Sequence, residues 1–183
     1  MKKWKVWHEM LLPALFALYM YVLFKIILFK FSSIDLPFVW QQLQRNLENP
    51  IYIQNRLAFA NFQPFVSITA NLQRLSQHDL INLFGNIAVF MPYGMFLLLT
   101  SGSKKISFSG VFIRSLGVSL SLESLQVVLS MGSFDVDDLI LNVLGGLVGY
   151  CGLKLGLTLK DRVLRMIDMQ SMSIMLTKES NIT

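Results

Sequence analysis

Four long apolar stretches constrain this chain more than any other feature of its sequence. They run approximately from 10 to 29, 80 to 100, 111 to 131 and 139 to 159. A helix of about 20 apolar residues crosses the roughly 30 Å hydrocarbon core of a bilayer. The sequence therefore predicts an all-α membrane protein, a bundle of about four transmembrane helices with a partly helical extracellular loop between the first and the second.

The composition and the length agree with this class of protein. Of the 183 residues, 54% are hydrophobic and 15% are charged, whereas a soluble domain carries about 25% charged residues. The first stretch is too long for the apolar region of a signal peptide and no cleavage site follows it, so an uncleaved anchor is expected. The length allows one domain. We assign residues 1–165 to that domain and residues 166–183 to a cytoplasmic tail.

The basic residues predict the orientation of the chain. They cluster before the first stretch, between the second and third, and after the fourth: Lys2, Lys3, Lys5, Lys104, Lys105, Lys160, Arg162 and Arg165. In a four-span topology these clusters share one side, which the positive-inside rule makes cytoplasmic. Both termini are therefore expected in the cytoplasm. This placement of the net charge of +5 indicates membrane orientation rather than a nucleic-acid surface.

A short amphipathic helix is expected in the segment between the first two spans. Asp35 and Pro37 suit a helix start, with a carboxylate cap and a proline in the first turn. Leu36, Trp40, Leu43 and Leu47 then recur at helical spacing, and Asn49-Pro50 ends the helix. The apolar stripe is interpreted in two ways: the helix lies on the outer leaflet, or it packs on the rim of the bundle.

Polar residues inside the third span point to a shared site. At 100° per residue, one narrow stripe contains Ser115, Ser119, Glu123, Gln126 and Ser130. An ionised Glu123 facing lipid would cost roughly 3 kcal/mol, so the stripe must face protein or a wet cavity. An ion pair with Lys25 is one interpretation of Glu123. In the other interpretation, Lys25 extends to the membrane surface instead.

The second and fourth spans carry polar groups at the same depth. Asn86 lies in the second span, and one face of the fourth carries Asp138, Asn142, Gly145, Gly149, Gly152 and Gly156. The glycines form small-x-x-x-small patterns that predict close helix packing. Asp135 and Asp138 are interpreted either as helix N-caps or as parts of a site. The predicted polar cluster comprises Asn86, Glu123, Gln126, Asp135, Asp138 and Asn142.

The order of these motifs resembles the VanZ-like family. The resemblance rests on Asn61-Phe62-Gln63-Pro64-Phe65, on Asn86-x-x-x-Phe90-x-Pro92-Tyr93-Gly94, on Glu123-x-x-Gln126, and on Asp135-x-x-Asp138-x-x-x-Asn142-x-x-Gly145 followed by Gly149. It covers approximately residues 10 to 157. The sequence departs from the family pattern in two ways. Tyr93 stands where phenylalanine is commoner, and the basic residue often found shortly before the first aspartate is absent, because residues 131–134 are Met, Gly, Ser and Phe.

The resemblance implies a bacterial cell-membrane protein. Eponymous members of the family reduce susceptibility to the glycopeptide antibiotic teicoplanin more than to vancomycin, which lacks teicoplanin's fatty-acyl chain. The resemblance also implies structural roles for the motif residues Asn61, Pro64, Phe65, Pro92, Gly94, Gly145 and Gly149.

Three classes of function remain open at this point. The first is a binding protein whose outer cluster engages teicoplanin or a lipid-linked cell-wall precursor. The second is a membrane enzyme acting on a lipid-linked or cell-surface substrate, with Glu123 as general acid or base and oxygen ligands for a divalent cation from Asp135, Asp138 and Asn142. The third is a structural scaffold. We assign no metal and no cofactor, and we expect membrane lipid but no nucleic acid as a partner.

Overall fold

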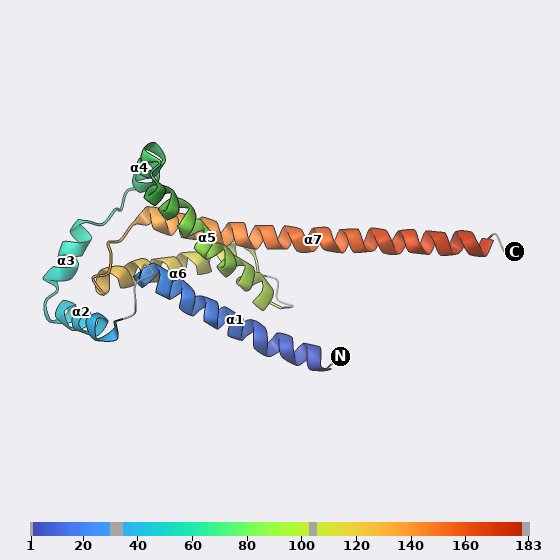
Figure 1. Ribbon diagram of the computed structural model, residues 1–183, viewed down its shortest axis with the longest axis horizontal. Helices are drawn as coiled ribbons and strands as arrows, with labels where there is room; N and C mark the ends of the chain where they lie inside the picture. The colour runs from blue at the N-terminus through green and yellow to red at the C-terminus, as the bar shows by residue number, and fades with distance from the viewer. Residues whose placement is uncertain (1, 30–34, 103–105, 181–183) are drawn as a thin grey trace. The chain divides into compact units, whose positions relative to one another are not determined.

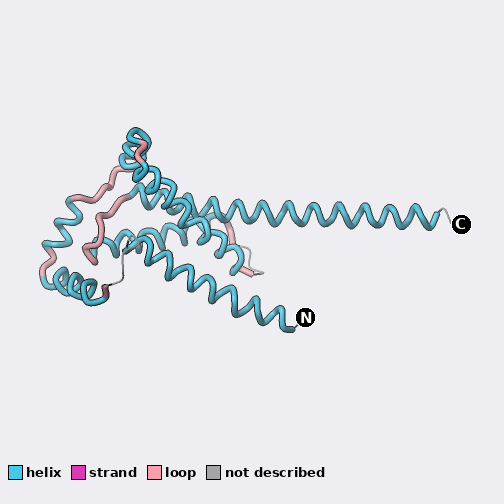
Figure 2. Tube along the Cα trace, in the orientation of Figure 1, coloured by secondary structure: helices cyan, strands magenta, loops and turns pink. Residues whose placement is uncertain are grey.

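The computed structural model describes residues 2–29, 35–102 and 106–180, with no side-chain description for 2–9 and 171–180. These residues form seven helices and no strand (Figures 1 and 2): α1 Lys2–Phe29, α2 Leu36–Glu48, α3 Ile51–Ala58, α4 Val66–Arg74, α5 Gln77–Thr100, α6 Phe108–Val128 and α7 Val136–Ser180. The predicted all-α class is confirmed. Two compact units divide the chain, Met1–Tyr150 and Cys151–Thr183. All the contacts that build the site lie in the first unit.

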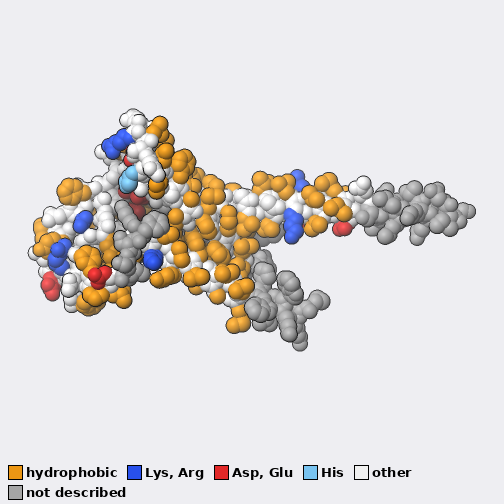
Figure 3. Space-filling view, viewed as in Figure 1, with side chains coloured by type: hydrophobic (Ala, Val, Ile, Leu, Met, Phe, Trp, Pro, Cys, Tyr) orange, Lys and Arg blue, Asp and Glu red, His pale blue; other side chains and the backbone are white. Residues whose placement is uncertain are grey.

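Four of these helices contain segments that are long and apolar enough to cross a membrane. The segments are Met10–Phe29, Gln77–Thr100, Phe108–Val128 and Val136–Gln170. Hydrophobic side chains cover much of this part of the surface (Figure 3). The chain is therefore a multi-pass membrane protein. The third predicted span, α6, ends at Val128 rather than at 131. Ser130 adopts a left-handed backbone (φ 54°), and the Gln126 carbonyl accepts the N–H groups of Met131 and Gly132.

Glycine allows the backbones of α5 and α7 to approach each other closely. A Cβ added to Gly149 would lie 1.9 Å from the carbonyl oxygen of Met91, and one added to Gly145 would lie 2.2 Å from that of Ile87. Gly94 faces the backbone of Gly146 in the same way, at 1.8 Å. These distances leave no room for a methyl group, so the glycines set the spacing of the two helices.

The other predicted glycine pattern makes no such approach. Gly152 and Gly156 are exposed, and a Cβ on either would meet no described atom within 4 Å. The packing prediction therefore holds for Gly145 and Gly149. For Gly152-x-x-x-Gly156, which lies in the second unit, close packing stays a prediction.

Helix α2 begins and ends as predicted but contacts the bundle through a polar residue. The carboxylate of Asp35 accepts the N–H of Phe38, and Asn49 is the C-cap. Asn46 is 1% exposed, and its side-chain amide donates to the Val128 carbonyl (2.7 Å) and the Ser130 hydroxyl (2.9 Å). The helix therefore contacts the rim of the bundle through Asn46 and not through the predicted apolar stripe. The apolar residues Leu36, Trp40 and Leu47 are exposed, and their contact with a leaflet stays a prediction.

Candidate functional site

Two carboxylates, Glu123 and Asp138, hold three spans together through separate hydrogen bonds. Glu123 on α6 is 1% exposed, and its Oε2 atom accepts the backbone N–H of Asp135 at 3.1 Å. Asp138, in the first turn of α7, accepts a hydrogen bond from the side-chain amide of Asn86 on α5 at 2.6 Å. These two bonds join α5, α6 and α7 at one end of the bundle. Polar groups buried in this way must be held by hydrogen bonds, because unpaired they would cost about 1–3 kcal/mol each.

A buried polar seam continues from this pair between α6 and α7. Asn142 lies one turn after Asp138 and donates its amide to the hydroxyl of Ser119 at 3.0 Å. Asn142 is 1% exposed, and Ser115 and Ser119 are fully buried. The carbonyl oxygen of Asn142 and the hydroxyl of Ser115 have no hydrogen-bond partner among the described residues. The seam therefore offers unused acceptors beneath the carboxylates.

Asp135 connects the start of α7 to the loop before α4. The backbones of Asn61 and Asp135 form an isolated parallel bridge. The side chain of Asn61 donates to Asp135 (2.9 Å), as does the hydroxyl of Ser67 (2.6 Å). Asp135 also accepts the N–H of Asp137 at 2.8 Å. That last bond is the N-cap interaction predicted for Asp135, so this residue both caps α7 and holds the loop.

Asp137 holds the start of α4 from a different part of the chain. It is fully buried, and its two oxygens accept the backbone N–H groups of Phe65 (2.5 Å), Ser67 (2.7 Å) and Ile68 (3.1 Å). A carboxylate is stabilised at the positive end of a helix, where the first N–H groups lack intrahelical partners. Asp137 was not among the predicted site residues. The sequence feature that could have indicated its role is its position two residues after the predicted cap Asp135.

The sequence matches a known protein family and one of its characterised members. The model of the VanZ/LLP1 family matches residues 16–157. The chain belongs to the VanZ/LLP1 family. It is similar to Protein VanZ of Enterococcus faecium, with 30% identity over 141 residues that cover 77% of this chain and 72% of that protein. No solved structure matches. The matched range contains every residue of the predicted polar cluster.

The structure separates one predicted cluster residue, Gln126, from the others. Asn86 bonds to Asp138, Glu123 bonds to the backbone of Asp135, and Asn142 lies one turn deeper on α7. Gln126 is buried too, but its side-chain amide donates to the Ile27 carbonyl near the end of α1 at 2.9 Å, so it fastens α1 to α6. Lys25 is exposed, in agreement with the surface-directed interpretation. Its ion pair with Glu123 stays a prediction.

The carboxylates of the cluster are arranged as hydrogen-bond acceptors. Among the described residues, no group of three or more histidine, cysteine, aspartate or glutamate side chains is placed to hold a metal ion. Asp135 instead receives two N–H donors and one O–H donor, and Asp137 receives three backbone N–H donors. The divalent-cation interpretation of Asp135, Asp138 and Asn142 therefore gains no support from this geometry.

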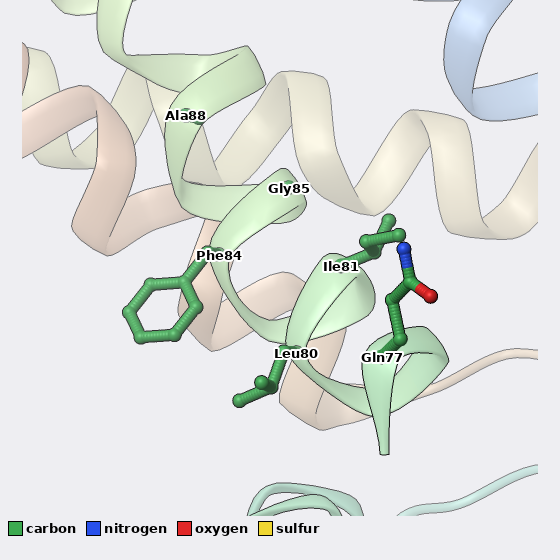
Figure 4. A pocket seen from close by; sticks show the side chains of 6 residues that line it. All are labelled: Gln77, Leu80, Ile81, Phe84, Gly85 and Ala88. Carbon is green, nitrogen blue, oxygen red and sulfur yellow. The ribbon is translucent and has the colours of Figure 1, made fainter. Parts of the chain in front are cut away.

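An apolar groove lies on α5 (Figure 4). Its lining comes from one face of that helix: Gln77, Leu80, Ile81, Phe84, Gly85 and Ala88. Asn86 is two positions from both Phe84 and Ala88, which places it about 200° around the helix from each. The groove therefore opens on the opposite side of α5 from the bond between Asn86 and Asp138. It does not extend the candidate site.

Proposed function

We propose that this VanZ/LLP1 protein lowers susceptibility to teicoplanin by engaging an acylated molecule at the outer face of the membrane. That molecule is the drug itself or a lipid-linked cell-wall precursor. The observation that carries the proposal is the convergence of Asn86, Glu123, Asp135 and Asp138 at one end of three spans. Family membership and the similarity to Protein VanZ support the resistance role.

The chemistry of the cluster suits a polar head group that donates hydrogen bonds. Carboxylate oxygens of the cluster would receive N–H or O–H groups of a peptide or sugar, and each bond to a charged acceptor is worth about 1.5–3 kcal/mol. The acyl chain of the same molecule would stay in the lipid beside the bundle. Such binding would lower the amount of drug that reaches its target, or would shield the target.

The proposal requires the cluster to face outwards, with both termini in the cytoplasm. The distribution of lysine and arginine supports this orientation. Glu48 in α2 and Asp161 in α7 are both exposed and should lie on opposite sides of the membrane. Cys151, the single cysteine, would be replaced by serine so that labelling reports only the introduced thiols.

In that background, we expect Glu48→Cys to react with a membrane-impermeant maleimide in intact cells. Asp161→Cys should react only after the cells are permeabilised, because its thiol would be cytoplasmic. Labelling is measured by the mass shift of the protein on a gel. The reverse pattern would place the carboxylate cluster inside and contradict the proposal.

Drug susceptibility tests the function itself. A susceptible Gram-positive host would carry this protein, its Glu123→Gln variant or an empty vector, and growth inhibition by teicoplanin and vancomycin would be measured. We expect the protein to raise tolerance to teicoplanin selectively, and Glu123→Gln to remove most of that gain. The loss of one charged acceptor at about 1.5–3 kcal/mol corresponds to roughly a tenfold or greater loss of affinity.

Glu48→Gln is the matched control, because it makes the same chemical change at an exposed residue of α2. It should keep full tolerance at equal membrane level, checked by immunoblot. Equal loss in the two variants would show that the effect does not arise at the cluster. No change in susceptibility to either drug with the unaltered protein would refute the resistance role.

A membrane enzyme is the second candidate function. The observation that favours it is a buried carboxyl group, Glu123, held by a backbone N–H beside further carboxylates, as the environment of a general acid or base requires. An altered lipid or wall precursor that appears only with intact Glu123 would support this class. Unaltered precursors together with saturable association of purified protein with teicoplanin would support binding.

A further inference from the structure

A polar pocket lies at the other end of α5 and α6, away from the carboxylate cluster. Its volume is about 500 Å³. The end of α5 and its C-cap contribute Leu97, Thr100 and Ser101 to the lining. Ile106, the N-cap Ser107 and the first turns of α6, with Gly110 and Arg114, contribute the rest. Among the described residues, no acidic side chain belongs to this lining, and Arg114 is its charged member. The described lining therefore combines a guanidinium with hydroxyl groups.

Arg114 is a charged residue inside a membrane span. It is the seventh residue of the apolar helix Phe108–Val128, which places it about 9 Å along the axis from the first residue. A guanidinium keeps its charge in a protein, and at the centre of a span such a charge costs about 2.5–3.5 kcal/mol. Arg114 is exposed rather than covered by protein. Its position is therefore favourable when it reaches an anion or the polar layer of the membrane.

The geometry of α6 directs Arg114 into the pocket. Ser107, Gly110 and Arg114 are spaced three and four residues apart, so they share one face of the helix. Side chains of a helix tilt towards its N-terminus, which for Arg114 is the direction of Ser107. Gly110, lying between them, has no side chain to block that path. The guanidinium and the Ser107 hydroxyl can therefore act on the same ligand.

Hydrogen bonds already made in the pocket define what else it can bind. Ser107 accepts the N–H of Gly110 at 3.0 Å, so its hydroxyl proton is available to donate. Thr100 and Ser101 donate to the carbonyl groups of Phe96 (2.7 Å) and Leu98 (2.8 Å). Their oxygens are left as acceptors. The pocket thus presents donors on the α6 wall and acceptors on the α5 wall.

We infer that this pocket binds the head group of an anionic phospholipid that carries hydroxyl groups. The phosphate accepts hydrogen bonds from Arg114 and Ser107, and hydroxyls of the head group donate to Thr100 and Ser101. A lipid is favoured over free phosphate because Arg114 is exposed within the span, where a lipid head group has its acyl chains beside it. The inference does not depend on the proposed role in drug resistance.

Lipid binding to the purified full-length protein tests this inference. Delipidated protein in detergent would be titrated with phosphatidylglycerol or phosphatidylcholine, and bound lipid counted by native mass spectrometry. The unaltered protein should bind phosphatidylglycerol at least about tenfold more tightly than phosphatidylcholine, as one charge-assisted contact predicts. Arg114→Gln should remove that preference. Arg114→Lys should keep part of it, because the charge remains.

Arg56→Gln is the matched control, since Arg56 is an exposed arginine of α3 outside the spans. It should bind phosphatidylglycerol like the unaltered protein. Thr100→Val keeps the shape of the side chain but removes its acceptor. It should weaken phosphatidylglycerol binding about threefold, as the loss of one neutral hydrogen bond predicts, and leave binding of phosphatidic acid unchanged. If Arg114→Gln fails to fold, Thr100→Val still tests whether the pocket binds the hydroxylated head group.

Three results would overturn the inference. Equal affinity for the two lipids would show that the pocket has no preference for an anion. Equal loss in Arg56→Gln and Arg114→Gln would show a general charge effect. Displacement of phosphatidylglycerol by millimolar inorganic phosphate, which then binds in an Arg114-dependent way, would assign the site to free phosphate instead of a lipid.

Discussion

Gly149→Ala is expected to destabilise the bundle by about 3 kcal/mol, the upper end of the usual range for overpacking. The new Cβ would lie 1.9 Å from the carbonyl oxygen of Met91. That oxygen belongs to the backbone of a continuous helix and cannot move aside as a flexible side chain can. The two helices must separate, which also disturbs the contact of Gly145 with Ile87. Unfolding of the purified protein in mixed detergent, followed by circular dichroism, measures the change.

Gly117→Ala is the matched control for this prediction. Gly117 is exposed on α6, and an added Cβ would meet no described atom within 4 Å. Alanine favours a helix over glycine by about 0.8–1.0 kcal/mol, so this variant should be as stable as the unaltered protein or more stable. If both variants unfold alike, the close approach of α5 and α7 does not limit stability.

Asp137→Ala is expected to cost about 3 kcal/mol, because it leaves three backbone donors of the α4 start without their acceptor. Those donors belong to Phe65, Ser67 and Ile68, and the replaced side chain is fully buried. The loss of stability should first affect the region around the start of α4. Amide hydrogen exchange at the start of α4 should accelerate strongly, while the amides of α6 should remain protected.

Asp35→Ala provides the comparison, since Asp35 caps α2 through a single exposed contact with Phe38 at 3.0 Å. Loss of an ordinary N-cap costs about 1 kcal/mol. The loss in Asp137→Ala should therefore be about threefold larger than in Asp35→Ala. Equal losses, or unchanged exchange at α4, would mean that Asp137 does not determine the placement of that helix.

Features that depend on local chemistry were predictable from the sequence. The length and hydropathy of four stretches located the spans, because a span needs only apolar residues in sufficient number. The start of α2 followed from Asp35 and Pro37, and the buried stripe of Glu123 followed from helical periodicity. Each of these inferences uses residues within a few turns of one another.

Apart from the bond between Asn86 and Asp138, which lie in the predicted cluster, individual contacts between distant residues were not predictable. Asn46 bonds to Val128, which lies 82 residues away, and Asp137 bonds to Ser67 across 70 residues. Gln126 belongs to the same helical stripe as Glu123, yet its side chain bonds to α1. A single sequence indicates which side chains share a face of one helix, but it does not specify which partner each side chain meets.

The bonds from Asp135 and Asp137 to the loop before α4 have a consequence for biogenesis. Ser67 leaves the ribosome well before the acids that hold it, since 70 residues separate it from Asp137. At 5–20 residues per second, that interval lasts roughly 4–14 seconds. During this time, Asn61 and α4 lack the partners that fix them. Insertion of the last helix therefore completes a part of the protein made much earlier, and a nascent chain stalled before residue 135 would expose an unfinished loop to quality-control proteases.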